Sequence, residues 1–389
     1  MTLQSLGRPP LTPLFALLLI RGIASFQLQA AAVAAPSLIG DLKLTYAQVG
    51  LAMGAFLLPG IFLTVPAGLM ARRFGDRPML RGAFVLLAAG IALSSLATGF
   101  PMLLAGRLLA GVGGVTILML VIKMTADRYA GPLLSTATSV VIVSWPLGTG
   151  LALVLLGPVE TAHGWRVVMG LSALPVLAGF ALTWLVGQAR VVAVSGDAPP
   201  AKVGIGFVAG AALSWGTYNG SIVVMATFLP ALFISIGLAA EAAAARSSIV
   251  LWSFAVVVPF CGFLADRVIG RTGAVVLGMG LTAASFLLVM PTGGAAWVLI
   301  LLGIGLALPP GALTAQVGDA TPPAARALVF GWYAAGSYCG MTSAPWIAGR
   351  LRDVSGDPNA PMLWGAGLML ILVPLYGWFR WEARRKSVS

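Results

Sequence analysis

Charged residues are scarce in this chain, and acidic residues are scarcer than basic ones. Asp, Glu, Lys and Arg together make up 9% of the 389 residues, whereas soluble domains carry about 25%. Hydrophobic residues reach 59%, and the mean hydropathy is +0.99. A chain this long and this apolar cannot bury its hydrophobic surface in a water-soluble core. The composition therefore predicts an integral membrane protein.

Cysteine and histidine are almost absent. Cys261 and Cys339 are the two cysteines, and His163 is the one histidine. Both cysteines lie in apolar stretches, so the sequence indicates no disulfide framework, and a single histidine supports no His-based metal cluster. The sequence also contains no Walker-type phosphate loop and no catalytic triad. We therefore expect neither an enzyme nor a bound cofactor or metal.

The acidic residues all fall in segments that read as loops between apolar stretches. Their number is 11, against 23 Lys and Arg, which gives a formal net charge of +12. In a soluble protein this excess would suggest a nucleic-acid partner. Here most of the basic residues collect in loops on one side, so a bilayer explains the charge better and we expect no nucleic acid. The sequence further predicts that no carboxylate relay runs through the spans.

Twelve apolar segments separate along the chain, and each is long enough to be a membrane helix. The first, from Leu11 to Ala35, ends in alanine-rich sequence like a signal-peptide cleavage site. Arg21, Gln27 and Gln29 interrupt its apolar core, so we interpret it as a retained helix. The expected spans are residues 13–35, 46–70, 80–98, 102–123, 135–157, 166–187, 204–235, 246–265, 273–291, 295–315, 326–349 and 361–380.

The basic residues predict the orientation. Sixteen of the 23 Lys and Arg residues fall on the side that holds both chain ends, and five fall on the other side. By the positive-inside rule the two termini are then cytoplasmic, in a bacterial inner membrane. A polar, proline-containing segment at 188–203 divides the spans six and six. We therefore expect an N-terminal bundle over 1–187, a cytoplasmic linker over 188–203 and a C-terminal bundle over 204–389.

The two halves carry similar motifs at matching places. Gly262-Phe-Leu-Ala-Asp266-Arg267-Val-Ile-Gly270-Arg271 follows the eighth span, and Gly68-Leu-Met-Ala-Arg-Arg-Phe-Gly75-Asp76-Arg77 follows the second. This pattern resembles the signature loop of the major facilitator superfamily. In the fourth span, Gly106-Arg107-Leu-Leu-Ala-Gly111 resembles the Arg-x-x-x-Gly element of that family's fourth helix. In the first copy Arg72 stands at the family's Asp position and the acid comes later, at Asp76. Residues 123–129 and 144–148 resemble members near the bacterial cyanate/nitroimidazole porter branch.

The resemblance implies an all-α membrane protein, with twelve transmembrane helices in two six-helix bundles related by pseudo-two-fold symmetry. It places a substrate near the bilayer midplane between the bundles. Spans 1, 4, 7 and 10 would line the cavity, while spans 3, 6, 9 and 12 would face lipid. The polar residues fall in agreement with this layout. The candidate substrate-binding residues are Arg21, Ser25, Gln27, Gln29, Trp215, Tyr218, Asn219, Trp332 and Tyr338.

Arg21 is the strongest single candidate. It lies in the middle of the first span, where a cation costs roughly 2.5–3.5 kcal/mol by insertion scales. Its planar guanidinium suits a carboxylate or a similar anion. A structural interpretation also stands, in which Arg21 binds a backbone carbonyl or stacks on an aromatic ring between helices. The aromatic candidates have the parallel alternative of simple packing or interface anchoring.

A second set of residues is expected to act in gating or coupling. Arg107 has the alternative role of a cation that reaches the membrane interface, and Lys123 that of an ordinary positive-inside anchor. The set is Arg107, Lys123, Asp76, Arg77, Asp266, Arg267 and Arg271.

The sequence therefore predicts a secondary or facilitative transporter of a small, carboxylate-like anion, working as a monomer by alternating access. Protons or a counter-anion are the expected coupling partners. Two alternatives remain open. The first is a proton-coupled exporter of drugs or other apolar solutes, and the second is a membrane receptor or scaffold that transports nothing.

Overall fold

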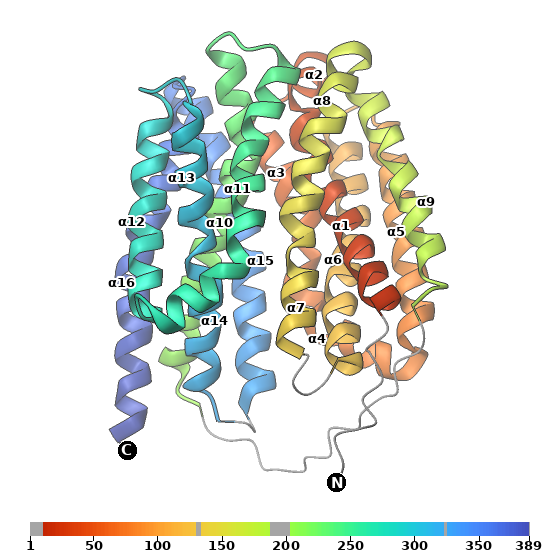
Figure 1. Cartoon of the computed structure of the whole chain (residues 1–389). Coiled ribbons are helices and arrows are strands. Elements are labelled where there is room, and N and C mark those ends of the chain that lie inside the picture. The colour runs from red at the N-terminus through yellow and green to blue at the C-terminus, as the bar shows by residue number, and fades with distance from the viewer. Residues whose placement is uncertain (1–10, 130–133, 187–202, 323–324, 389) are drawn as a thin grey trace.

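The computed structural model describes residues 11–129, 134–186, 203–322 and 325–388. Every regular element in these residues is an α-helix, and the helices run side by side along a common direction (Figure 1). The first half consists of α1 (Leu11–Val33), α2 (Ala35–Leu42), α3 (Tyr46–Leu57), α4 (Pro59–Phe74), α5 (Asp76–Ser95), α6 (Phe100–Arg128), α7 (Leu134–Ile142), α8 (Ser144–Leu171) and α9 (Ala173–Leu182).

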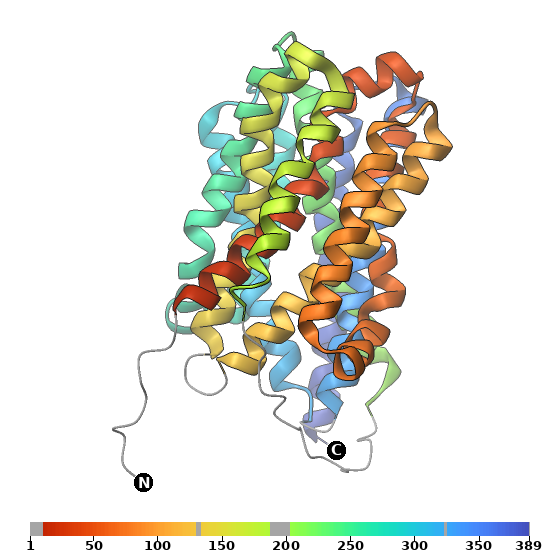
Figure 2. The same ribbon diagram turned by 90° about the vertical axis from the view of Figure 1, so that its right-hand side faces the viewer.

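The second half consists of α10 (Ile205–Ser235), α11 (Ala240–Arg267), α12 (Arg271–Val289), α13 (Ala296–Ala307), α14 (Pro309–Asp319), α15 (Arg326–Ser355) and α16 (Ala360–Val388). We call the end with the α4–α5 and α11–α12 turns the proximal end. The opposite end, with α2 and the α10–α11 turn, is the distal end (Figure 1). The view in Figure 2 shows α1, α5 and α9 crossing the first half from one end to the other.

The twelve predicted spans are recovered as helices. Within the described residues, ten segments are long and apolar enough to cross a membrane. One of them, Val140–Leu182, covers both the fifth and the sixth span, because α8 continues through a kink at Gly164. The span missing from the ten is α15, which carries several polar and charged side chains in its second half. The predicted all-α membrane fold is therefore confirmed.

Three spans are interrupted where a proline removes a backbone donor. α3 gives way to α4 at Pro59, α7 to α8 just before Pro146, and α13 to α14 at Pro309. A proline has no N–H for the carbonyl four residues earlier, so that carbonyl is left without its helical partner. The interruption before Pro146 shapes the candidate site.

Gly75 and Gly270 begin the equivalent helices of the two halves. Gly75 precedes α5 with φ 87°, and Gly270 precedes α12 with φ 73°. Side chains rarely adopt this left-handed backbone region, so glycine is favoured at both turns. The repeated motif of the sequence therefore has the same backbone role in each half. The predicted linker at 188–202 lies outside the described residues, and the domain boundaries stay predictions.

The predicted placement of the acids in loops is wrong for most of them. Among the described residues, only Asp357 lies outside a helix, while the others occupy helix ends or a helix interior. Helices here extend beyond the apolar spans, because their end turns continue into the more polar region. Glu160 departs furthest from the prediction, since it lies inside α8 with a side chain that is 6% exposed.

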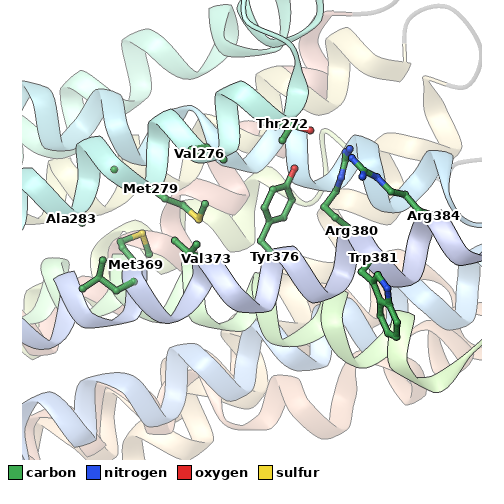
Figure 3. A pocket seen from close by; sticks show the side chains of 13 residues that line it. Thr272, Val276, Met279, Ala283, Met369, Val373, Tyr376, Arg380, Trp381 and Arg384 are labelled. Carbon is green, nitrogen blue, oxygen red and sulfur yellow. The ribbon is translucent and has the colours of Figure 1, made fainter.

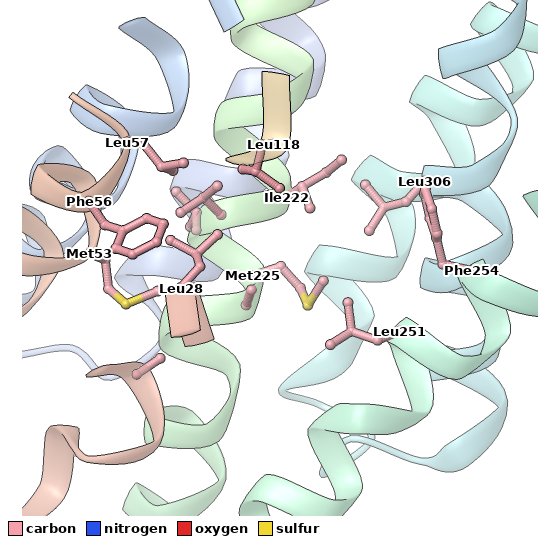
Figure 4. Packing of buried hydrophobic residues seen from close by; sticks show 14 of the residues in the cluster. Leu28, Met53, Phe56, Leu57, Leu118, Ile222, Met225, Leu251, Phe254 and Leu306 are labelled. Atoms are coloured by element: carbon pink, nitrogen blue, oxygen red, sulfur yellow. The ribbon is translucent and has the colours of Figure 1, made fainter. Parts of the chain in front are cut away.

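The two halves meet through an apolar interface at mid-bundle. Figure 4 shows side chains of the first half facing side chains of the second across it. Leu28 and Leu118 approach from the first half, and Ile222, Met225 and Leu251 from the second. All five are 9% exposed or less. Polar side chains are therefore few at the interface, and those present stand out.

Candidate substrate-binding site

Arg21 lies at mid-length on α1 and binds the interrupted fifth span. Its Nη1 donates to the carbonyl oxygens of Val141 (3.3 Å) and Ile142 (3.2 Å), and to Ser144 Oγ (3.0 Å). Ile142 lies four residues before Pro146, so its carbonyl is the one that the proline leaves without a helical donor. Arg21 therefore supplies the missing hydrogen bond, as the structural interpretation predicted. This contact also fixes the orientation of the guanidinium.

The opposite edge of the Arg21 guanidinium is unpaired. Its Nε is buried without a hydrogen-bond partner, and within the described chain no hydrogen bond holds Nη2. The side chain as a whole is only half-buried. Nε and Nη2 form one of the two edges through which arginine binds a carboxylate with two parallel hydrogen bonds. An unpaired buried donor is unfavourable, so an anion at this edge would stabilise it.

Tyr338 brings the second half of the molecule to the same place. It lies at mid-length on α15, and its hydroxyl is near enough to Arg21 for electrostatic interaction. Its ring packs over Gly60 of α4, where a Cβ atom would lie 2.5 Å from the ring. Arg21 and Tyr338 are therefore two polar groups, one from each half, that both lie near the middle of the bundle.

The other polar residues of α1 are occupied by neighbouring backbone groups. Ser25 Oγ donates to the carbonyl of Arg21 at 3.1 Å, and Gln27 Nε2 donates to the carbonyl of Ser172. Gln29 Nε2 donates across the interface to the carbonyl of Ala226 at 2.7 Å, while its Oε1 is buried without a partner. The structure thus places Gln29 between the halves, and Ser25 and Gln27 within the first half.

The aromatic residues of α10 form a stack inside the second half. Trp215 lies between Tyr218 and Tyr333, with ring centroids 5.2 Å and 4.9 Å away. Tyr218 is 1% exposed and its hydroxyl donates to the carbonyl of Leu306. Asn219 Nδ2 donates to the carbonyl of Trp215 at 2.8 Å. Tyr218 and Asn219 are therefore held by their own half. Trp332, by contrast, is 58% exposed.

Arg107 is enclosed by the first half. It is 1% exposed, and it donates to the carbonyls of Ala52 (3.2 Å), Gln27 (3.2 Å) and Leu28 (3.1 Å). Its guanidinium also lies 4.8 Å from the ring centroid of Phe56. These contacts join α6 to α1 and α3. A role in coupling stays a prediction, and it would act through the position of α1.

The proximal end carries one cation between two acids in each half. Lys123 Nζ lies 2.9 Å from Asp76 and 2.8 Å from Asp127. In the second half Arg271 Nε lies 2.7 Å from Asp266, and its Nη1 pairs with Asp319. The two arrangements join equivalent helix ends. The Arg271 pairs are largely exposed, and exposed pairs contribute little to stability, about 0–1 kcal/mol each, whereas the Lys123 pairs are partly buried. A role of both arrangements in gating stays a prediction.

The two remaining gate candidates behave differently. Arg77 Nε donates to the carbonyl of Val186, which ties the start of α5 to the end of the sixth span. Arg267 is exposed at the end of α11. The structure therefore gives Arg77 a defined partner within its own half.

At the distal end the backbones of α3 and α15 lie in direct contact. A Cβ atom at Gly50 would overlap the carbonyl oxygen of Pro345, and one at Gly54 would overlap that of Thr342. A Cβ at Gly349 would overlap the carbonyl of Tyr46. Small residues allow helices to approach this closely within a membrane. We call these paired segments of α3 and α15 the distal seal.

Asp353 of α15 completes the distal seal by capping α3. Its two carboxylate oxygens accept hydrogen bonds from the backbone N–H groups of Tyr46 (2.9 Å) and Ala47 (2.8 Å). Thr45 caps the next free donor, Gln48 N, at 3.2 Å. The neighbouring Arg352 lies 3.7 Å from the Tyr46 ring centroid. An anion at a helix N-terminus is favourable, so the cap stabilises the contact between the halves.

Replacing Asp353 by Ala is expected to loosen the distal seal. Loss of a helix cap costs about 0.5–2 kcal/mol, or a roughly two- to thirtyfold shift in a conformational equilibrium. Spin labels at Gly40→Cys and Ala242→Cys, in a background without Cys261 and Cys339, would report it as a larger population with long label-to-label distances. Asp357→Ala is the matched control, because Asp357 lies in the α15–α16 turn. An unchanged distance distribution in Asp353→Ala would contradict the assignment.

Glu160 was predicted to lie in a loop, and the sequence analysis therefore did not name it as a functional residue. It lies at the distal end of the bundle. Its Oε1 accepts a hydrogen bond from the backbone N–H of Ser37 at 3.2 Å. A small cavity of about 60 Å³ beside it is lined by both halves, including Tyr46 and Pro230. The helical spacing from Leu153 through Leu156 to Glu160 was the signal that would have placed this acid on the buried face.

The sequence and the fold both match one large family. The profile of the Major Facilitator Superfamily matches residues 17–213 and 206–389. The chain therefore belongs to the Major Facilitator Superfamily. The D-xylose-proton symporter has a solved structure with a TM-score of 0.72, at 16% identity over 93% of this chain and 97% of that one. This likeness supports the fold.

Two curated relatives are also similar in sequence. The 3-(3-hydroxy-phenyl)propionate transporter of Escherichia coli is 28% identical over 189 residues, which is 47% of this chain and 46% of the relative. The hexuronate transporter of Bacillus subtilis is 26% identical over 156 residues, or 40% of this chain and 37% of the relative. The matched segment thus spans less than half the length of each of these relatives.

Proposed function

We propose that the protein is a secondary transporter that carries a small organic anion of the carboxylate type across the membrane by alternating access. The unpaired Nε–Nη2 edge of Arg21, at mid-depth in the bundle, is the observation that carries the proposal. A carboxylate would bind this edge, and the Tyr338 hydroxyl would donate to the same anion from the other half. The two relatives named above carry carboxylates according to their names, which supports this substrate class.

In the proposed cycle the two halves rock about a substrate held between Arg21 and Tyr338. The distal seal closes one path, and the charge arrangements at Lys123 and Arg271 belong to the other end. Gln29, which bonds Ala226 across the interface, would report the closed state of the distal end. In this scheme Trp215 and Tyr218 support α10 rather than contact the substrate.

Glu160 makes proton coupling a concrete part of the proposal. It is a buried carboxylate at the distal end, beside a cavity that both halves line. Symport with a proton and exchange against a counter-anion are the two forms of coupling that the proposal includes.

The finer placement also belongs to the proposal. We infer cytoplasmic termini and a bacterial inner membrane from the basic residues of the loops, and a monomer as the working unit. The relationship to the cyanate/nitroimidazole branch rests on the motifs near Lys123 and Ser144.

Flux into proteoliposomes tests the function. We expect the purified protein to carry a labelled small monocarboxylate with saturable kinetics, and cyanate or a monocarboxylate in excess to compete. A cationic dye serves as the probe for the alternative, a drug exporter, which the Trp215 stack would favour. Dye efflux without carboxylate flux would exclude the proposed substrate class. Substrate-induced stabilisation without any flux would indicate a receptor instead.

A further inference from the structure

A groove lies on the outer face of the second half, apart from Arg21. It runs between α12 and α16, has a volume of about 490 Å³, and is lined by apolar side chains along most of its length (Figure 3). Val276 and Val373 on its walls are 53% and 52% exposed. Met279 and Met369 face each other across it. Exposed apolar walls of this kind suit a hydrocarbon chain.

The groove changes character at the proximal end. Arg380, Arg384 and Thr272 line its last part, and Trp381 lies beside them (Figure 3). The same three residues also line a second cavity of about 530 Å³, which continues toward Arg271 and Asp319. Arg271 pairs with Asp319 and so offsets the acid there. The two cavities together therefore make one site with an apolar limb and a cationic polar limb.

Gln316 provides an independent sign that the polar limb takes a ligand. It lines the second cavity and is 8% exposed. Its Oε1 accepts hydrogen bonds from Tyr376 Oη (2.9 Å) and from Arg380 Nη1. Its Nε2 is buried and has no partner among the described residues. A buried donor without an acceptor is unfavourable, and a phosphate or ester oxygen in the cavity would supply one.

We propose that this site binds an anionic phospholipid. One acyl chain fills the apolar limb between α12 and α16. The headgroup phosphate lies beside Arg380 and Arg384 and accepts a hydrogen bond from Gln316 Nε2. Basic pockets between membrane helices bind anionic headgroups, and tryptophan is favoured at the level of the headgroups. The charge and the shape of the site thus match one lipid class, because a zwitterionic headgroup has the same phosphate but adds a cation, which the two nearby arginines disfavour.

The headgroup part of the proposal is tested by lipid retention. The whole protein is incubated with equal amounts of phosphatidylglycerol and phosphatidylcholine, and bound lipid is measured by native mass spectrometry. We expect a preference for phosphatidylglycerol that falls by about 30-fold in the Arg380→Gln/Arg384→Gln variant, since each arginine contributes near a membrane surface. The control Arg73→Gln/Arg326→Gln removes two exposed arginines of the proximal end. Equal retention of both lipids, or an unchanged preference in the variant, would overturn the proposal.

The acyl-chain part is tested by filling the groove. A Cβ at Gly377, which lines the groove, or at Gly367, on the same helix outside it, meets no atom within 4 Å. Gly377→Leu is therefore expected to expel the lipid, while Gly367→Leu retains it. Inorganic phosphate in excess separates the two sources of the anion. If inorganic phosphate binds the protein without lipid, and Gly377→Leu does not reduce lipid retention, the ligand is the free ion and the lipid proposal is wrong.

Discussion

Replacing Arg21 by Gln is expected to reduce carboxylate flux by roughly 10- to 150-fold, because hydrogen bonds to a charged group contribute about 1.5–3 kcal/mol. The glutamine amide keeps a donor for the carbonyl of Ile142 but offers no positive charge and no second edge. The measurement is the rate of labelled monocarboxylate uptake into proteoliposomes at matched protein density. Arg73→Gln is the control, because it removes an exposed arginine from the proximal end.

Arg21 has two tasks in this structure, and a second substitution separates them. Pro146→Ala restores an N–H for the carbonyl of Ile142, so the interrupted span no longer needs the arginine as a donor. If Arg21 serves only to bind that carbonyl, Pro146→Ala will restore flux to the Arg21→Gln variant. If Arg21 binds the substrate, the double variant will regain thermal stability and stay inactive. Recovery of full flux in the double variant would refute the anion site.

Substituting Leu at Gly54 is expected to abolish net transport while the protein still folds in the membrane. The new Cβ would overlap the carbonyl oxygen of Thr342, which belongs to the backbone and has no room to rotate away. α3 and α15 must then separate, so the distal seal no longer closes. The same spin-label pair, at residues 40 and 242, would show the long distances as the dominant population. Net flux would fall about tenfold for each 1.4 kcal/mol by which the substitution destabilises the closed distal seal.

Gly82 provides the matched control for that experiment. It lies on α5 of the same half, and a Cβ there meets no atom within 4 Å. Gly82→Leu adds the same volume to the lipid-facing surface and should leave both the distance distribution and the flux unchanged. A Gly54→Leu variant with wild-type distances would show that the distal contact is not the gate.

Some functional residues could be predicted from the sequence and others could not. Arg21 was identified because a cation inside an apolar span has few explanations. A bond to a backbone carbonyl was one of two structural alternatives, but Ile142 was not foreseen as the partner, since it lies more than a hundred residues away. Glu160 was missed because it ends an apolar run and looks like a loop acid. Its burial depends on the packing of α2 against α8, which no local pattern reports.

The sequence by itself determined that this chain crosses the membrane many times, because hydropathy and helix length are properties of contiguous residues. It also determined the repeated turns at Gly75 and Gly270, where the backbone itself requires glycine. Only the tertiary structure decided which polar groups meet. Asp353 caps α3, Tyr338 lies near Arg21, and Gln316 has an unpaired donor. Hydrogen bonds need partners within about 3 Å, and such proximity is determined by how the helices pack.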